Sequence, residues 1–446
     1  MALQAFGKEI TITNRLTMKK LLFTLLCLPM IVFGQEWTFG GVDEDFGTSV
    51  QQTIEGGYII TGQTRSFGNG SWDVYLIKTD QNGIEQWNKT FGGINDDEGK
   101  SVQQTADGGY IIVGVTESFG LGNGDIYLIK TDGNGDSLWT KTFGGLNADW
   151  GNSVQQTVDE GYVIAGVTES FGAGGRDVYL IKTDGNGDSL WTKAFGGSDE
   201  DEGNSVQQTT DSGYIIIGNT RLFTNGDNDI YLIKTDENGV EQWNQTFGGS
   251  DEDEGNCVQE TNDGGYIITG GTRSFGIDTD VYLIKTDGNG IEQWDKTFGG
   301  AYNDIGTSVQ QTTDGGYIVC GVNNLALEIA QLVYLIKTDV NGVEQWSQTF
   351  GGLSPFSAGN SVQQTTDGGY IVCGWIIVFE FSPSEVYLIK TDGNGSVTST
   401  FNIPINPNRK IEKTVDLLGK QTKPQPNTPF IEIYNDGTVE KRIVIE

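Results

Sequence analysis

Apolar residues along most of the chain gather in short runs rich in Val, Ile, Tyr, Thr, Phe and Trp, the residue types that favour a pleated surface. Four such runs read GKSVQQT (99–105), GGYIIVGVT (108–116), DIYLIKTD (125–132) and DSLWTKTFGG (136–145). Asp-Gly-Gly and Asp-x-Asn-Gly sequences, which suit tight hairpins, separate run one from run two and run three from run four. No part of this unit shows sustained helical periodicity, so we expect four antiparallel strands, labelled a to d.

This four-run unit recurs along the chain. The phrase SVQQT begins at Ser49 and returns six more times, with Cys257 in place of serine in the fifth copy. The phrase YLIKTD returns at steps of 51 to 53 residues, and its lysines are Lys78, Lys130, Lys182, Lys234, Lys285, Lys337 and Lys390. Both series give seven copies.

Four short antiparallel strands cannot bury both of their faces alone, whereas stacked copies bury them against one another. Repeats of about 40 to 50 residues with four strands are typical of β-propeller blades, of which a propeller has about four to eight. We therefore predict an all-β fold: a seven-bladed β-propeller of four-stranded blades over residues 35–395, followed by a small C-terminal β domain.

The ends of the repeat array favour a closed ring. Glu36-Trp37-Thr38-Phe39 matches a d run but precedes the first SVQQT phrase, and only a degraded SVTSTF follows the last YLIKTD. We predict that the Trp37 strand completes the last blade. The alternative is an open solenoid in which SVTSTF forms its own last strand.

The c–d connection repeats the pattern Asp-x-Asn-Gly-x-x-x-Trp, as in Asp80 to Trp87 and Asp132 to Trp139. It resembles the tryptophan-docking motif of quinoprotein-type propellers, in which an indole packs between blades over a glycine peptide. The distance from Asp to Trp is one residue shorter here. The resemblance implies the propeller fold and says little about a quinone cofactor.

The N-terminal segment has the features of a secretory signal peptide. Met18-Lys19-Lys20 precedes an apolar run of 13 residues, shorter than the roughly 20 that span a membrane, and a small residue, Gly34, follows. We expect residues 1–34 to be an N-terminal extension and signal peptide, with Met18 as the start and cleavage between Gly34 and Gln35.

Residues 396–446 contain five of the eight prolines and no repeat. Their D-x-x-G-K and Y-x-D-G-x-V-x-K elements resemble the type A C-terminal sorting domain of type IX secretion cargo in Bacteroidota. The matching residues are Asp416, Gly419, Lys420, Tyr434, Asp436, Gly437 and Lys441. The resemblance implies a linker and sorting domain, export through the type IX secretion machinery, and a product that is secreted or attached to the outer-membrane surface. The alternative is a small β domain without a sorting role.

Charge and composition exclude several functions. The net charge is −33; residues 1–34 carry +3 and residues 396–446 carry +1, so the propeller segment carries −37. Such a field opposes nucleic acid and anionic membranes and favours cations. The absence of histidine removes Ser-His-Asp catalysis and histidine metal sites.

An aspartate series precedes the a runs, each member two residues before a glycine: Asp45, Asp97, Asp149, Asp201, Asp253 and Asp304. If these carboxylates converge at the channel mouth, they form a calcium site. The alternative is that each aspartate caps a turn within its own blade. We predict no other cofactor.

The b–c loops vary among copies while the a–b and c–d turns hardly vary, and variable loops on a uniform scaffold are typical of binding surfaces. The last two b–c loops become apolar, as at Ile376, and either form an exposed patch or fill a gap. We expect a non-catalytic binding or adhesion module whose ligand is a glycan, a surface polymer or a protein. The alternatives are a secreted hydrolase or lyase that uses paired carboxylates on polysaccharide, and a structural surface component.

Overall fold

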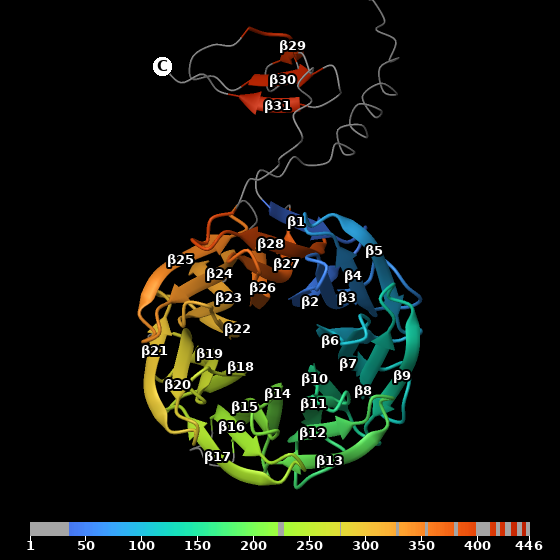
Figure 1. The fold of residues 1–446 in the computed structure, drawn as a ribbon, viewed down its shortest axis with the longest axis vertical. Coiled ribbons are helices and arrows are strands. Elements are labelled where there is room, and N and C mark those ends of the chain that lie inside the picture. The colour runs from blue at the N-terminus through green and yellow to red at the C-terminus, as the bar shows by residue number, and fades with distance from the viewer. Residues whose placement is uncertain are drawn as a thin grey trace, which may run out of the picture. The chain divides into compact units, whose positions relative to one another are not determined.

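The computed structural model describes residues 35–221, 227–276, 278–326, 330–352, 356–378, 382–397, 411–415, 420–423, 430–434 and 439–442. The chain divides into two compact units, Met1–Thr398 and Ser399–Glu446. No helix occurs among the described residues. The first unit is a β-propeller: antiparallel four-stranded blades stand around a central axis (Figure 1), as the sequence predicts.

The a strands lie innermost in this ring, and the d strands lie at the rim (Figure 1). The a strands are β2 (Asp45–Gln52), β6 (Asp97–Gln104), β10 (Asp149–Gln156), β14 (Asp201–Gln208), β18 (Asp253–Glu260), β22 (Asp304–Gln311) and β26 (Phe356–Gln364). The b strands are β3 (Tyr58–Thr64), β7 (Tyr110–Thr116), β11 (Tyr162–Thr168), β15 (Tyr214–Thr220), β19 (Tyr266–Thr272), β23 (Tyr317–Ala326) and β27 (Tyr370–Ile377).

The c strands carry the YLIKT sequence and are β4 (Asp73–Thr79), β8 (Asp125–Thr131), β12 (Asp177–Thr183), β16 (Asp229–Thr235), β20 (Asp280–Thr286), β24 (Ala330–Thr338) and β28 (Ser384–Thr391). The d strands are β5 (Glu85–Phe91), β9 (Ser137–Phe143), β13 (Ser189–Phe195), β17 (Glu241–Phe247), β21 (Glu292–Phe298), β25 (Glu344–Phe350) and β1 (Gln35–Phe39).

The strands group by sequence order, with one exception at the ends. Five sheets contain β2–β5, β6–β9, β10–β13, β14–β17 and β18–β21. An eight-stranded sheet combines β22–β25 with β26–β28 and β1, and a single parallel pairing of Gln331 with Phe356 joins its two halves. β1 pairs antiparallel with β28, with Trp37 opposite Leu388. The prediction that the Trp37 strand completes the last blade is confirmed.

Burial explains the hydropathy of each strand. The c strand β8 is buried at all seven positions, and the d strand β9 is mostly exposed. The a strand β6 alternates between buried and partly buried positions. Because neighbouring blades cover both faces of the b and c strands, these strands are continuous apolar runs rather than alternating ones.

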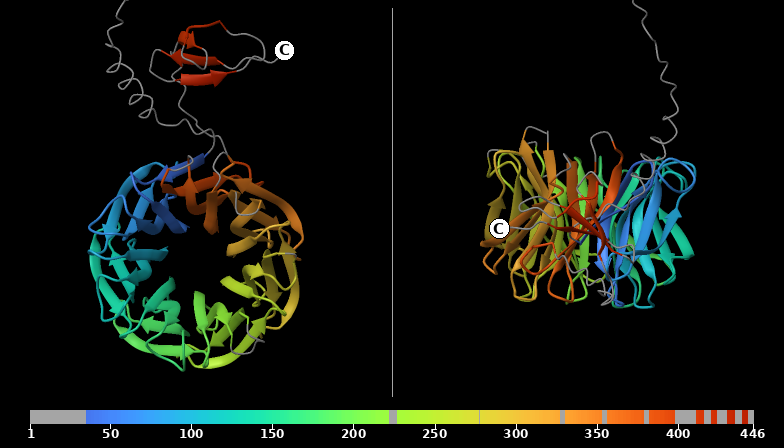
Figure 2. Two further views of the ribbon diagram at one scale, coloured as in Figure 1. Left: turned by 180° about the vertical axis from the view of Figure 1, so that it is seen from behind. Right: turned by 90° about the horizontal axis from the view of Figure 1, so that it is seen from above.

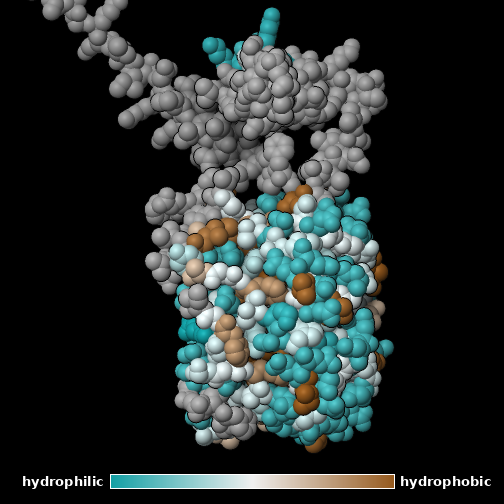
Figure 3. All heavy atoms as spheres, turned by 90° about the vertical axis from the view of Figure 1, so that its left-hand side faces the viewer, coloured by the Kyte–Doolittle hydropathy of each residue, from teal (hydrophilic) through white to brown (hydrophobic). Residues whose placement is uncertain are grey.

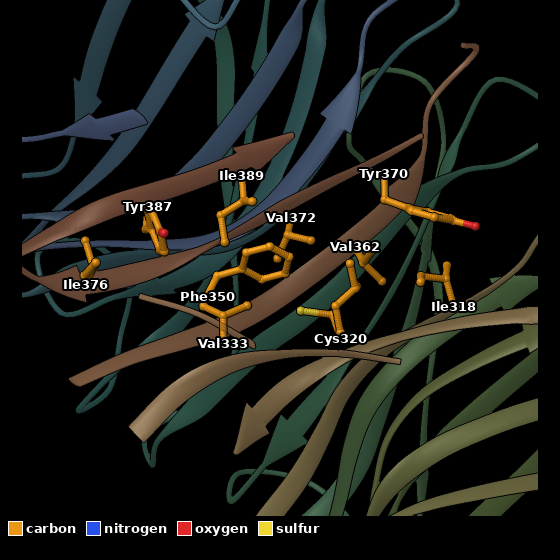
Figure 4. Close-up of a cluster of buried hydrophobic side chains, with 11 residues drawn as sticks. Ile318, Cys320, Val333, Phe350, Val362, Tyr370, Val372, Ile376, Tyr387 and Ile389 are labelled. Carbon is orange, nitrogen blue, oxygen red and sulfur yellow. The ribbon is translucent and has the colours of Figure 1, made fainter. Parts of the chain in front are cut away.

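The hydrophobic core lies between blades rather than inside one sheet. In one cluster Ile59 and Leu76 of one blade pack with Tyr110 and Ile112 of the next. In another, Cys320, Val333 and Phe350 pack with residues of β26–β28 (Figure 4). Ile376 is 8% exposed and belongs to this second cluster, so its interpretation as gap filling is confirmed.

The second unit is described by three strands, β29 (Ile411–Val415), β30 (Phe430–Tyr434) and β31 (Val439–Arg442), which form one antiparallel sheet in that order. Of the sorting-motif residues, Tyr434 ends β30 and Lys441 lies in β31 opposite Ile431. Lys420 is described outside any strand. Asp416, Gly419, Asp436 and Gly437 lie outside the described residues, as does Gly34 at the predicted cleavage position.

Candidate binding face

The connections of the propeller emerge on two opposite faces (Figure 2). The d–a and b–c connections lie together on one face, here called the loop face; for example, the Ser66 hydroxyl donates to the carbonyl of Asp43 at 3.1 Å. The a–b and c–d connections lie on the other, here called the turn face. A site on one face is therefore built from different repeat positions than a site on the other.

The turn face is held by buried lysines. Lys130 of the YLIKTD phrase has a side chain only 4% exposed, and its Nζ lies 2.9 Å from an Asp107 carboxylate oxygen in the a–b turn and donates to the Thr131 carbonyl at 2.8 Å. Burial opposes ionisation of Asp107, but hydrogen bonds from Thr105 and Lys130 lower its pKa to about 2. The same lysine–aspartate pair recurs at Lys182, Lys234, Lys285, Lys337 and Lys390.

The last residue of the phrase forms the c–d turn. Asp132 Oδ1 accepts hydrogen bonds from the N–H groups of Asn134 and Asp136, each at 2.9 Å. Gly135 completes the turn with φ of +78°, a left-handed conformation that favours glycine. The phrase YLIKTD is thus repeated because each blade has the same buried core and the same turn, and six blades have the same ion pair.

The tryptophans pack as the resemblance to docking motifs implies. A Cβ placed on Gly135 would lie 2.6 Å from the ring of Trp87 in the preceding blade, so the indole covers the turn peptide closely. The same contact recurs from blade to blade, and Trp37 of β1 lies against Gly83 of the blade that follows it in the ring. Side-chain packing therefore crosses the closure between β28 and β2.

The SVQQT phrase has a role that sequence reasoning missed. Its first glutamine accepts a hydrogen bond from the backbone N–H of the second glutamine position in the SVQQT phrase of the next blade. For example, Gln207 Oε1 accepts from the Glu260 N–H at 2.6 Å. In ring order, the other bonds of 2.5–2.6 Å run from Gln259 to Gln311, Gln310 to Gln364, Gln363 to Gln52, Gln51 to Gln104, Gln103 to Gln156 and Gln155 to Gln208. These bonds join every a strand to the next, including β26 to β2.

Two hollows lie at these glutamines. The central channel forms a cavity of about 240 Å³ lined by the first glutamines and the valines that precede them, such as Val206 and Gln207. A second hollow of about 540 Å³ lies beside the a–b turns near Glu260 and Thr210. The Glu260 carboxylate accepts from both the N–H and the hydroxyl of Thr210, at 2.8 and 2.9 Å.

The aspartates of the candidate calcium site lie inside the blades at the loop face. Asp97 is fully buried, and its Oδ2 accepts from the Gly93 N–H at 2.8 Å and from the Ser118 hydroxyl at 2.6 Å. Asp45, Asp149, Asp201, Asp253 and Asp304 are likewise fully buried, and each accepts from the N–H four residues earlier at 2.8 Å. This placement corresponds to the alternative in which each aspartate caps its own loop.

Each of these aspartates except Asp45 also faces a c-strand aspartate of the preceding blade. A Cβ on Gly248 would collide with both the Asp229 and the Asp253 carboxylates. Burial, followed by the neighbouring charges of Asp253 and Asp227, raises the pKa of Asp229 to about 6. Burial and the charge of Asp280 likewise raise the pKa of Asp304 to about 6, against the opposing hydrogen bonds.

These pairs do not supply what a calcium ion needs. Calcium takes six to eight oxygen ligands, whereas the described residues contain no group of three or more Asp, Glu, Cys or His side chains able to hold a metal ion. Asp97 Oδ2 is already occupied by two hydrogen-bond donors. A calcium site stays a prediction, and we derive no function from a metal here.

The d–a loops on the loop face differ in hydropathy from one repeat to the next. Val42, Ile94 and Leu146 follow the Phe-Gly-Gly sequence at the end of three d strands and are 84%, 81% and 80% exposed. The corresponding residues in the next three repeats are Ser198, Ser250 and Ala301. This d–a position is therefore apolar and strongly exposed at Val42, Ile94 and Leu146; Leu353, which follows the seventh Phe-Gly-Gly, lies outside the described residues.

A half-exposed phenylalanine of the b–c loop lies beside each of these residues. A Cβ on Gly93 would lie 3.5 Å from Cζ of Phe119, and Gly93 directly precedes Ile94. Phe67 and Phe171 occupy the same place beside Gly41 and Gly145. We call the set the apolar arc: Val42, Phe67, Ile94, Phe119, Leu146 and Phe171. By contrast, the rim near β21 and β25 shows hydrophobic residues standing singly among hydrophilic ones (Figure 3).

Charged and aromatic contacts hold the loops around the arc. The Arg65 guanidinium lies 4.3 Å from the centre of the Trp72 ring and 2.8 Å from the Glu44 carboxylate. Arg176 similarly lies over Trp150 and pairs with Glu169 and Glu202. Such contacts order the loop face before any partner binds.

Several acidic groups near the arc lack a basic partner. Asp43, Asp96 and Glu117 form no ion pair with a lysine or arginine of the described chain. Burial, together with the charges of Asp96 and Glu98, raises the pKa of Glu117. The surface around Ile94 and Phe119 is therefore negative.

Comparison with known proteins establishes no family for the chain. No family model matches it. The regulatory protein FlaEY of Caulobacter vibrioides is 28% identical over 198 residues, which cover 38% of this chain and 20% of that protein, so the chain spans about a fifth of the length of this curated relative.

Solved structures with a similar fold share little sequence with the chain. The Pan2 WD40 domain of Neurospora crassa is 11% identical, with a TM-score of 0.48 over 78% of this chain and 91% of that one. A puromycin hydrolase is 12% identical, with a TM-score of 0.49 over 90% of this chain and 61% of that one. Within the described part of the chain, no helix is long and apolar enough to cross a membrane.

Proposed function

We propose that the protein is an exported, non-catalytic binding module built on a seven-bladed β-propeller, which contacts its partner through the loop face. The apolar arc carries the proposal. Residues that repeat for structural reasons are the same in nearly every blade, whereas this d–a position changes from Val42, Ile94 and Leu146, which are at least 80% exposed, to Ser198, Ser250 and Ala301. Exposed apolar residues that depart from the repeat cost solubility without adding to the core, which favours an interaction site.

A hydrolase or lyase is less well supported. Its mechanism would need a pair of carboxylates that a polysaccharide can reach. The pair of Asp73 with Asp97 is at most 2% exposed and lies between blades, and in the pairs of Asp229 with Asp253 and Asp280 with Asp304 only the c-strand aspartate is partly exposed. The chain contains no histidine, the side chain that most often transfers protons near neutral pH.

A pair of isoleucines allows a matched test of the loop face. Ile94 on the loop face and Ile54 on the turn face are 81% and 84% exposed, so Ile94→Ser and Ile54→Ser change the same chemistry on opposite faces. The full chain and both variants should be applied to arrays of glycans, surface polysaccharides and proteins, with a hydrolysis assay alongside. The proposal expects binding that Ile94→Ser weakens and Ile54→Ser does not. Turnover of a polysaccharide, or equal losses in both variants, would contradict it.

We also propose that the chain is exported through the general pathway and then by the type IX machinery, with cleavage between Gly34 and Gln35. Support comes from the charged and apolar segment before Gln35 and from the sorting-motif residues between Asp416 and Lys441. In a host with type IX secretion, removal of residues 414–446 should leave the protein inside the outer membrane. Release or surface display of the truncated chain would rule out the sorting role.

A further inference from the structure

We propose that the partner of the apolar arc is a protein segment that carries basic residues beside apolar ones. This inference rests on the proposed binding function and names the chemistry of the partner. Each blade of the arc presents two adjacent apolar side chains, as Ile94 and Phe119 do across Gly93. Apolar side chains of this size add about 1.5 to 3 kcal/mol each when fully buried, so several together can anchor a partner.

The charges around the arc indicate which residues must accompany the apolar residues of the partner. Asp43 and Glu117 are exposed, the Glu117 N–H donates to the Asp96 carbonyl at 2.8 Å, and no lysine or arginine of the described chain pairs with any of the three. Burial, followed by the charges of Asp96, Glu98 and Asp97, raises the pKa of Glu117. Lysine or arginine on a partner would relieve the repulsion among these charges and fix the orientation of the complex.

The same charges disfavour the other occupants. A second copy of this chain would bring its own acidic surface against this one, since the chain carries a net charge of −33. An anionic membrane or a nucleic acid would be repelled for the same reason. A neutral glycan can donate hydroxyl hydrogen bonds to the carboxylates but brings no positive charge, whereas a basic protein segment offers cations to the carboxylates and apolar side chains to the arc.

A pair of synthetic peptides tests this chemistry on the full-length protein. One peptide carries leucines on one side and lysines beside them, and the other replaces each lysine with glutamate. Fluorescence anisotropy at physiological salt should show binding of the lysine peptide only. The variant Ile94→Ser should weaken that binding roughly tenfold, which corresponds to about 1.4 kcal/mol, and Ile54→Ser should leave it unchanged.

A second matched pair separates the arc from general electrostatic attraction. Val42 on the loop face and Val158 on the turn face are each 84% exposed, so Val42→Ser should weaken binding and Val158→Ser should not. No peptide binding, equal binding by all variants, or equal binding of the glutamate peptide would overturn the proposal. Sedimentation that shows a wild-type dimer lost in Ile94→Ser would assign the arc to a second copy instead.

The peptide experiment and the array experiment can fail independently of each other. If the arrays show glycan binding that Ile94→Ser abolishes while the lysine peptide does not bind, the binding function of the loop face stands and the inferred partner chemistry is wrong. If neither the arrays nor the peptide depend on Ile94, both proposals fail.

Discussion

At the scale of single residues, specific contacts in the folded chain explain why the repeated residues recur. The lysine of the YLIKTD phrase can be buried because the a–b turn supplies a carboxylate, as at Lys130. The aspartate of the phrase caps the c–d turn that follows it, as at Asp132. The sequence predicted the turns because their chemistry is local. It could not predict the buried ion pair, since Lys130 and Asp107 are 23 residues apart and meet only when the strands pair.

The aspartates before the a strands show how a correct pattern can leave two interpretations open. Their regular spacing is visible in the sequence, but their burial and their donors are not. Asp97 accepts from Gly93 in its own loop and from Ser118 in the b–c loop. Because the sequence does not show which way a side chain points, it could not choose between a shared site at the channel mouth and a cap within each blade.

We expect glycine to be needed at Gly135 for two separable reasons. The variant Gly108→Ala changes a glycine of φ +82° with no atom within 4 Å of the added Cβ, so it measures the backbone cost alone, about 1 kcal/mol. Gly135→Ala adds the collision with Trp87 and should lower the free energy of unfolding by about 2 to 4 kcal/mol. Denaturant titration compares them, and equal costs would refute the tryptophan contact.

The buried carboxylates predict an unusual dependence of stability on pH. The pKa of Asp229 and of Asp304 is about 6 in the folded protein, against about 3.9 for an unfolded aspartate. The folded state then binds more protons between pH 4 and 6, so the free energy of unfolding should fall as the pH rises through that window. Asp107, with a pKa of about 2, has the opposite effect, and its contribution is lost as the pH falls from about 4 to 2.

Stability should therefore be greatest near pH 4 to 5. Urea denaturation across this range measures it, and Asp229→Asn should flatten the decline above pH 5 because it removes one buried charge. A stability that climbs steadily from pH 4 to pH 7 in the unmodified protein would show that these carboxylates are not paired as described.

At the scale of strands, apolar periodicity and residue type were sufficient to locate the blades. The predicted runs 108–116 and 125–132 contain β7 (Tyr110–Thr116) and β8 (Asp125–Thr131), with the flanking glycines left in the turns. The role of the glutamines was not predictable in this way. Each Gln207-type side chain bonds to a strand of the next blade, so its partner is about 53 residues away and is known only once the ring geometry is known.

The glutamine bonds between a strands give a direct test of how blades are joined. Gln207→Ala removes the acceptor for the Glu260 N–H and should cost about 1 to 3 kcal/mol of unfolding free energy, the usual penalty for an unpaired polar group. Gln207→Glu replaces the amide oxygen with a carboxylate oxygen that can accept the same bond, as Glu260 does for Thr210, and should cost less. Thermal unfolding of the two variants distinguishes them; equal losses would mean that the acceptor is unimportant.

At the scale of the whole molecule, the propeller is a ring closed by its two ends. Strand pairing, indole packing and the glutamine bonds all continue across the junction, through β1 with β28, Trp37 with Gly83, and Gln363 with Gln52. The sequence predicted this closure because the Trp37 strand has the sequence of a d strand but precedes the first a strand. It could not assign a partner, because the apolar arc reveals itself only through exposure on the folded surface.

Hydrogen exchange along β28 tests the closed ring most directly. β28 lies between β27 and β1, so in the native protein every amide of Val386 to Ile389 should be protected, whichever neighbour it faces. In the open stack that the sequence also allows, SVTSTF rather than β1 would cover this edge of β28. Removal of residues 35–39 should therefore let the β1-facing amides of β28 exchange at solvent rates in the ring, and protection of β28 that is unchanged by this removal would contradict the ring.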